Sequence, residues 1–403
     1  MSAHDIGPIR TPATAPPVSD FAEILFGHLA RVDQRRWAEA YLRGLLTTPG
    51  KKSVRRLATA VSSSPTAAHS LQQFLNASPW DWAPARRELT RLAEHRVPAR
   101  AWSLATAVLP KRGEHSVGVH RAFVPAAGRI VNAQRGLGAF VSADGEHIPV
   151  DWHLMLPEHW TDDAQRRRRT RIPLSVHHRP VSDQAIDLVD NLRSGTTLPP
   201  PPVLADMSEH PGTDALLRGL LEREQDFVVA VPGRLEVVPT AGPAYRTPGE
   251  RPSLGAFGFL RQSTLRRPQC TAAPDRAGRV THIRTVSGTV RLPGDPAQDG
   301  TGRGVLRLFT ECRPAGHRPA HLWITNLVNS RMDELFGLVR LHSGTAAAIE
   351  EMREHYGLFD FEGRSYPGWH HHMTLVSAAY AYHRMARRAV APGAARAPAR
   401  TAA

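Results

Sequence analysis

Hydrophobic positions follow a helical period through the first hundred residues. Apolar side chains recur every three to four positions between Phe21 and Val32, directly behind Ser19-Asp20, a pair typical of helix starts. Two short helices are expected next, over 53–61 and 66–76, separated by a Ser-Pro turn. The stretch before Ser19 is rich in Pro, Ala and Thr. We therefore predict a disordered tail over 1–18 and an N-terminal helical domain over 19–100.

After residue 100 the pattern changes to that of strands. Three runs begin near 101, 116 and 130, and turn signals at Gly128 and Asp144-Gly145 accompany them. They predict an antiparallel three-stranded meander, followed by an arginine-rich helix near Asp162 and a helix after Ser182. A short apolar strand then ends in Asp206, and a helix and another apolar strand, 227–231, follow it. A carboxylate at the end of such a strand is often functional in α/β folds.

The remaining chain divides into an insertion and a closing part. Residues 239–304 are rich in Gly, Pro, Thr and Arg with strand-like pieces, which predicts a β-rich insertion. Strands resume over 305–311 and 321–326, and two long helices are expected over 332–354 and 368–388. The prediction is an α/β (α+β) fold whose core spans 101–238 and 305–388, with a disordered tail over 389–403.

Composition narrows the protein class. Hydrophobic residues make up 41% of the 403 residues, enough for a real core, which excludes a wholly disordered chain. The two cysteines exclude a disulfide scaffold and a thiolate zinc cluster. The sequence has no apolar run of about 18 residues, so no membrane association is expected. The N-terminus also has no signal-peptide-like stretch. A cytoplasmic location is expected, at the nucleoid when DNA is bound.

Charge points to nucleic acid. The formal net charge is +14, and all basic residues except Lys51, Lys52 and Lys111 are arginines. Codon usage of a GC-rich genome explains the arginine bias, but the excess positive charge favours a polyanion partner in either case. We therefore expect double-stranded DNA as the partner. A homodimer is one alternative for the oligomeric state.

Two segments are candidates for DNA contact, each with a plain alternative. The helix pair over 53–76 has the length of a helix-turn-helix and leaves three polar side chains outward, or it is ordinary helical packing. The run on the arginine-rich helix either contacts phosphates or is a solvated face. The candidate DNA-binding residues are His69, Gln72, Gln73, Arg166, Arg167, Arg168 and Arg169.

A run of three histidines, His370, His371 and His372, suggests a metal site at first sight. Consecutive residues of a helix point in different directions, so these three cannot chelate one ion together. We expect them to be structural.

Several short segments together resemble one family. They include Lys111-Arg112-Gly113, Asn132-Ala133-Gln134, Trp160-Thr161-Asp162-Asp163 and Gly368-Trp369-His370. In order and spacing, over roughly 20–388, the chain resembles the insertion-sequence DDE transposases, the 701 group in particular. The resemblance implies an RNase-H-like core with an insertion, in which three carboxylates hold two Mg²⁺ ions for phosphoryl transfer.

Matching that family's catalytic positions onto this chain leaves one carboxylate. The second position falls on Asp206, whereas the first falls on Ala105 and the third on Ala346. Residues 97–113 contain no Asp or Glu, so a small change of register does not restore the first position. Glu350, Glu351 and Glu362 are alternatives at the third. Asp206 alone cannot hold two Mg²⁺ ions, and its plain interpretation is a cap for the following helix.

The sequence therefore predicts a transposase-like, catalytically inactive protein that binds DNA, with no cofactor expected. One alternative is an active transposase with substitute carboxylates and Mg²⁺. Another is a repurposed enzyme or partner-binding protein.

Overall fold

The computed structural model describes most of the chain. The described residues are 16–124, 128–240, 253–263, 268–274, 280–294, 304–312 and 321–390. The expected tails, 1–18 and 389–403, lie almost entirely outside them, since the first helix begins at Val18 and the last ends at Val390.

The N-terminal region is helical, as predicted. Its helices are α1 (Val18–Phe26), α2 (Val32–Thr47), α3 (Val54–Val61), α4 (Ala67–Asn76) and α5 (Ala83–Arg96). The apolar positions with helical spacing face inward: on α4, for example, Leu71, Phe74 and Leu75 are almost fully buried.

The antiparallel part of the sheet differs from the prediction in one respect. Strand β3 (Arg129–Ala143) pairs with β1 (Ala101–Pro110) on one edge, and with β4 (Glu146–Leu154) and the short β2 (His120–Val124) on the other. The meander is therefore β1–β3–β4, and the run over 116–124 contributes only a short strand at its end. We did not predict β4, although its apolar residues Ile148, Val150, Trp152 and Leu154 alternate with less apolar ones, and Pro149 within the run disfavours a strand.

Parallel strands continue the sheet beyond β1. Strand β5 (Val203–Asp206) lies between β1 and β6 (Phe227–Val231) and runs parallel to both. Helices α8 (Val181–Gly195) and α9 (Thr213–Glu222) precede and follow β5, and the small helices α6 (Glu158–Thr161) and α7 (Ala164–Thr170) precede α8. The predicted α/β fold class is thus confirmed.

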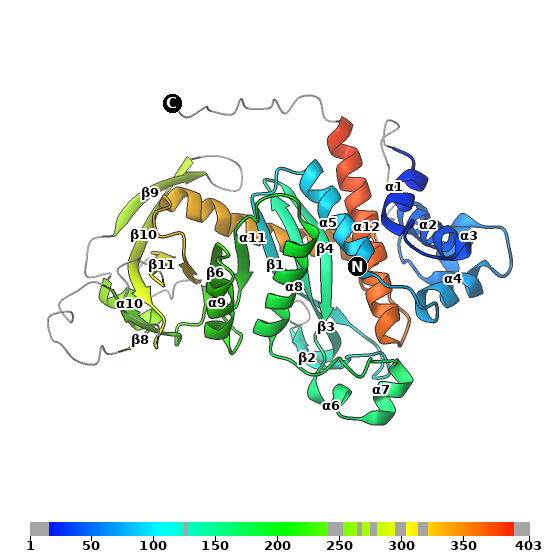
Figure 1. Ribbon diagram of the computed structural model, residues 1–403, viewed down its shortest axis with the longest axis horizontal. Coiled ribbons are helices and arrows are strands. Elements are labelled where there is room, and N and C mark those ends of the chain that lie inside the picture. The colour runs from blue at the N-terminus through cyan, green and yellow to red at the C-terminus, as the bar shows by residue number, and fades with distance from the viewer. Residues whose placement is uncertain are drawn as a thin grey trace.

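The insertion joins the same sheet. Beyond β6 come β12 (Leu322–Thr325), β11 (Leu306–Glu311) and β10 (Val280–Arg291), and β10 also pairs with β7 (Glu236–Pro239) and β9 (Gln269–Pro274). The two-residue strand β8 (Leu254–Gly255) and helix α10 (Ala256–Ser263) complete this part, on the left of Figure 1. The described part of 239–304 therefore extends the central sheet.

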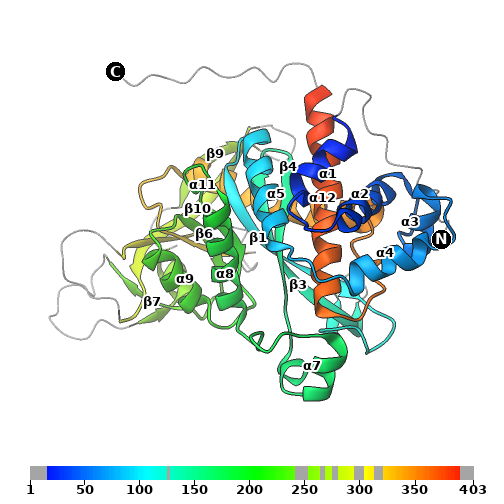
Figure 2. The same cartoon turned by 45° about the vertical axis from the view of Figure 1, so that its right-hand side comes forward.

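Two long helices enclose the core. Helix α11 (Met332–His355) covers one face of β1, β5 and β6, where Leu335 and Phe336 pack with Leu204 and Val228. Helix α12 (Tyr366–Val390) packs against β4 and against α2, α4 and α5. Figures 1 and 2 show α12 between the helices α1–α4 and the sheet, with α5 on the sheet itself. The helical region and the sheet consequently share one hydrophobic core. Within the described residues, none of the helices combines the length and the apolar character needed to cross a bilayer.

A buried ion pair connects these layers. Arg86 on α5 donates to Asp151 on β4 over 2.6 Å, and both side chains are less than a tenth exposed. The Arg86 guanidinium also donates to Thr374 Oγ1 and the His370 carbonyl on α12, and Asn191 on α8 donates to the other Asp151 oxygen. One charge pair therefore holds the N-terminal helices, the sheet, α8 and α12 together.

Breaking this pair should cost far more stability than breaking a surface pair. Arg86→Met leaves the Asp151 carboxylate buried without its counterion, and we expect it to lower the free energy of unfolding by about 3–5 kcal/mol. Arg100→Met removes an exposed pair with Asp144, and should cost at most about 1 kcal/mol. Urea unfolding of both variants measures the difference. Equal losses would show that the buried pair has no special role.

Candidate functional site

Asp206 and Ala105 are neighbours across two strands. The parallel register of β1 and β5 pairs Leu104 with Ala205, so the next residue of each strand, Ala105 and Asp206, lie side by side. Ala105 is also paired with Gly138 of β3. The residue of β1 beside Asp206 therefore has only a methyl side chain. Its neighbour on β3, Gly138, has no side chain.

The Asp206 carboxylate is already engaged by protein donors. Its Oδ1 accepts hydrogen bonds from the Ser208 backbone N–H and hydroxyl, over 3.0 and 2.6 Å. Its Oδ2 lies 3.0 Å from Nε2 of His321, the residue before β12. Burial opposes ionisation, but the hydrogen bonds from His321 and Ser208 outweigh it and hold the pKa of Asp206 well below the usual range of a carboxyl.

Helix α11 approaches the same place with a histidine. His342 Nε2 donates to the Leu104 carbonyl over 3.1 Å, so it anchors the helix on β1 next to Ala105. Burial lowers the pKa of His342 and keeps the ring neutral. Ala346 lies one turn further along the helix and is exposed. Neither residue brings a carboxylate to Asp206.

The alternative carboxylates have other partners. Glu350, about two turns beyond His342, pairs with Arg353, and Glu351 contacts Tyr380 and Arg384 of α12. Glu362 lies 3.1 Å from the Lys51 ammonium. The contacts described for Asp206 involve Ser208 and His321, so the structure does not bring Glu350 or Glu362 to it.

These donors do not fit a pair of divalent metal ions. Mg²⁺ takes oxygen ligands in near-octahedral geometry, and a two-metal site needs several carboxylates to bridge and balance two ions about 3.5–4 Å apart. Here the single carboxylate of Asp206 lies beside Ala105 and already accepts hydrogen bonds from Ser208 and His321. Within the described ranges, no group of three or more His, Cys, Asp or Glu side chains is placed to hold a metal ion.

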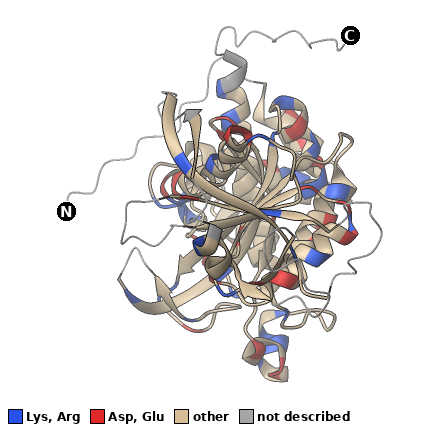
Figure 3. Cartoon of the chain, turned by 90° about the vertical axis from the view of Figure 1, so that its left-hand side faces the viewer, with Lys and Arg blue, Asp and Glu red and all other residues tan. Residues whose placement is uncertain are grey.

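Of the four consecutive arginines of α7, Arg166 and Arg167 contact groups of their own lobe, and Arg168 and Arg169 face solvent. Arg167 is directed inward and donates to the carbonyls of Thr161 and Pro173, so it holds its own loop together. Arg166 lies over the Trp160 ring and pairs with Asp163, the cap of the helix. Arg168 and Arg169 are exposed. Figure 3 shows acidic and basic residues mixed in this lobe, at the bottom of the view.

The three polar side chains predicted to face outward on α4 are all exposed. His69 and Gln73 line a groove of about 350 Å³ together with Trp37 of α2, and Gln72 lies outside it. The structure does not bring these residues near Asp206, so α4 and the sheet carry separate candidate surfaces.

The three histidines of the run contact three different groups of neighbours. The His371 ring nitrogens lie 2.8 and 2.9 Å from the carbonyl oxygens of Leu75 and Trp80, and His372 contacts Tyr41 and Gly357. His370 contacts Arg86. The three rings therefore reach different parts of the N-terminal helices and of the preceding loop.

Sequence reasoning missed His321 and His342. His321 reaches Asp206 only because β12 pairs with β6, a contact between distant segments that leaves no local pattern. His342 carried a signal, since it lies one turn before Ala346 on the same helix, where its side chain shares a face with that residue.

We predict that Asp206 stabilises the fold as an anion. Because its pKa is lower in the folded than in the unfolded chain, its contribution is present above the unfolded value of about 3.9 and lost as pH falls through the folded value. The side chain is about a third exposed, so after screening Asp206→Asn should cost about 1 kcal/mol near neutral pH.

Urea unfolding from neutral to acid pH measures this effect, with the exposed Asp226→Asn as the control. The gap between the natural chain and Asp206→Asn should close on acidification. A gap that stays constant, or that matches Asp226→Asn, would contradict the prediction.

Comparison with known proteins places this site in a family. The model of the DDE superfamily endonucleases matches residues 24–291, which include β1 and Asp206. A cryo-EM structure of the piggyBac transposase synaptic complex with hairpin DNA is similar over 95% of this chain and 77% of that one, at 10% identity and a TM-score of 0.44. The curated proteins give no match. The family model covers well over half of the 403 residues, and the chain therefore belongs to the DDE superfamily endonucleases.

Proposed function

We propose that this chain is a transposase-derived DNA-binding protein of the insertion-sequence 701 type that no longer transfers phosphoryl groups. The observation that carries the proposal is the register of β1 and β5, in which Leu104 pairs with Ala205 directly before Ala105 and Asp206, with His321 on the Asp206 carboxylate. The family's chemistry requires a carboxylate where Ala105 stands.

The energetics of the site favour loss of metal binding. A Mg²⁺ ion at Asp206 would have to displace the hydrogen bonds from Ser208 and His321, and would gain a single carboxylate in return. Without metal ions, the Asp206 carboxylate still accepts hydrogen bonds from Ser208 and His321. The fold consequently keeps this residue without the function that the family gives it.

DNA binding is supported by charge and by family. The net charge of +14 favours a polyanion, and the exposed Arg168 and Arg169 side chains have no ion pair or hydrogen bond among the described residues. Free guanidinium groups donate strong, charge-assisted hydrogen bonds to phosphate oxygens. Membership of an endonuclease family makes DNA the polyanion that we propose.

We predict that Mg²⁺ binds the natural chain no more tightly than it binds an ordinary surface carboxylate. Calorimetric titration with Mg²⁺ and Mn²⁺ measures this directly. Ala105→Asp with Ala346→Glu would place one carboxylate beside Asp206 and one on α11, so this double variant should bind metal more tightly than the natural chain. Two tight sites in the natural chain would contradict the prediction.

We also predict duplex binding that weakens steeply with salt. The logarithm of the affinity should fall linearly with the logarithm of the salt concentration, with a slope of about 0.9 for each phosphate contact. Arg168→Ser with Arg169→Ser should reduce this slope by at most the contribution of two phosphate contacts. Fluorescence anisotropy at several salt concentrations provides the measurement.

The matched control removes two arginines from another surface. Arg91→Ser with Arg96→Ser changes the net charge equally, but on α5, which Figure 2 shows at the opposite end of the molecule from α7. Its slope should equal that of the natural chain. Equal slopes for all three proteins would remove α7 from the interface, and absence of binding at low salt would contradict the proposed function.

A further inference from the structure

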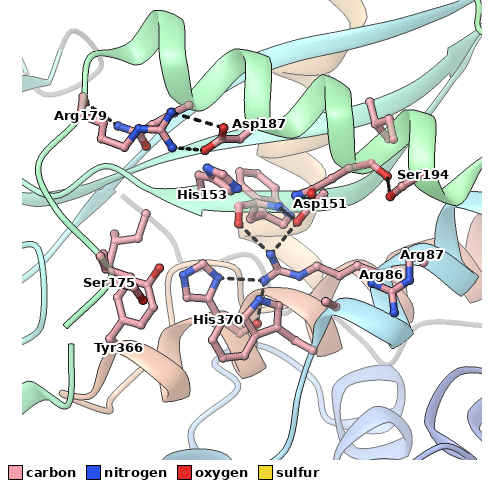
Figure 4. Close-up of a pocket in the computed structure, with 18 of the residues that line it drawn as sticks. Arg86, Arg87, Asp151, His153, Ser175, Arg179, Asp187, Ser194, Tyr366 and His370 are labelled. Carbon is pink, nitrogen blue, oxygen red and sulfur yellow. Dashed lines mark hydrogen bonds and ion pairs between the residues drawn. The ribbon is translucent and has the colours of Figure 1, made fainter. Parts of the chain in front are cut away.

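A cavity lies apart from Asp206 and from the groove at α4. It has a volume of about 290 Å³, at the small end of the range for ligand pockets, and lies between α5, β4, α8 and the start of α12 (Figure 4). On β4, Asp151 pairs with Ala139 of β3, and Ala139 pairs with Leu104 of β1, so these three residues face the same side of the sheet. Ala105 follows Leu104 and faces the other side, because alternate residues of a strand face opposite sides. The cavity therefore opens on the face of the sheet opposite to Ala105 and Asp206.

Both carboxylates of the cavity are already neutralised. Asp151 is paired with Arg86, and its oxygens also accept from the Trp152 backbone N–H and from Asn191. Asp187 is paired with Arg179 at the upper left of Figure 4. The cavity therefore presents no free negative charge to a ligand.

The uncommitted groups are donors. Among the described contacts, the Arg87 guanidinium, the Tyr366 hydroxyl and the His153 ring nitrogens have no hydrogen-bond partner, although all three line the cavity. Figure 4 shows Tyr366 and Arg87 on opposite sides of Arg86, with His153 above it. The Arg87 guanidinium and several other polar groups, Ser175 and His177 among them, are thus left for a ligand.

Their protonation states suit an acceptor-rich ligand. Burial raises the pKa of Tyr366 to about 12, so its hydroxyl keeps its proton at neutral pH. Burial also lowers the pKa of His153, which leaves a neutral ring with one N–H to donate. Nearby, the buried His370 Nε2 has no partner. Its Nδ1 lies 3.2 Å from an Arg86 N–H and must accept, so Nε2 carries a hydrogen.

The remaining walls are flat and apolar. Trp82 stacks on His370 at 4.4 Å between ring centroids, and Tyr366 meets His370 edge-on. Leu154 and Val176 also line the cavity. From these walls and from the single unpaired arginine, we propose that the cavity binds a small aromatic molecule carrying one anionic group, a carboxylate or a phosphate. Arg87 binds the anion, and the aromatic walls hold the ring.

Calorimetric titration of the full chain with two probes tests the site. Salicylate carries a carboxylate on its ring, adenosine 5′-monophosphate carries a phosphate, and phenol is the uncharged comparison. We expect one of the two anions to bind at one molecule per chain, and phenol to bind more weakly than that anion. Arg87→Gln should weaken the anion about tenfold, as expected for a lost charge-assisted hydrogen bond. Tyr366→Phe, which keeps the ring, should weaken it several-fold.

Two controls separate this site from the rest of the surface. Arg96→Gln changes the same charge on the same helix outside the cavity, and Arg168→Ser with Arg169→Ser alters the proposed DNA surface. Both should bind the probe like the natural chain. Binding of neither anion, or binding that Arg87→Gln and Tyr366→Phe leave unchanged, would overturn the inference. Its failure would leave the proposed function intact, because DNA binding uses other residues.

Discussion

The arrangement of the whole molecule depends on the buried ion pair between Arg86 and Asp151. Removing two charges from water is costly, and the pair is stable because hydrogen bonds also satisfy the remaining donors and acceptors. These partners come from α8, β4 and α12. The contacts therefore fix how the N-terminal helices and α12 sit on the sheet.

At the position that we propose for the nuclease site, the chain keeps the scaffold, and we propose that it has lost the chemistry. Strands β1 and β5 and helix α11 meet there, but the residues they contribute are Ala105, Asp206 and His342. Three clustered carboxylates repel one another unless metal ions balance them. Where Ala105 and Ala346 stand at two of the three positions, as we propose, this repulsion is absent, and Ser208 and His321 supply hydrogen bonds to Asp206.

Local periodicity explains what the sequence could predict. The ranges predicted for the helices α3, α4, α11 and α12 agree with the structure within a few residues, and the apolar pattern is strong in α3 and α4. Strand β4 was missed although its apolar residues alternate, and Pro149 interrupts its run. Arg86 and His321 were missed because their partners are distant in the chain. The resemblance to a family assigned Ala105 to the first catalytic position. The register of β1 and β5 then shows that Ala105 lies next to Asp206.

The central claim is that the Ala105 position disables phosphoryl transfer while DNA binding persists. The most direct measurement is a cleavage and strand-transfer assay of the purified natural chain on duplex DNA with Mg²⁺ or Mn²⁺, with Asp206→Asn in parallel. We expect both proteins to bind the duplex and neither to nick or join it. Cleavage by the natural chain that Asp206→Asn abolishes would contradict the account, because other residues would then have to complete the site.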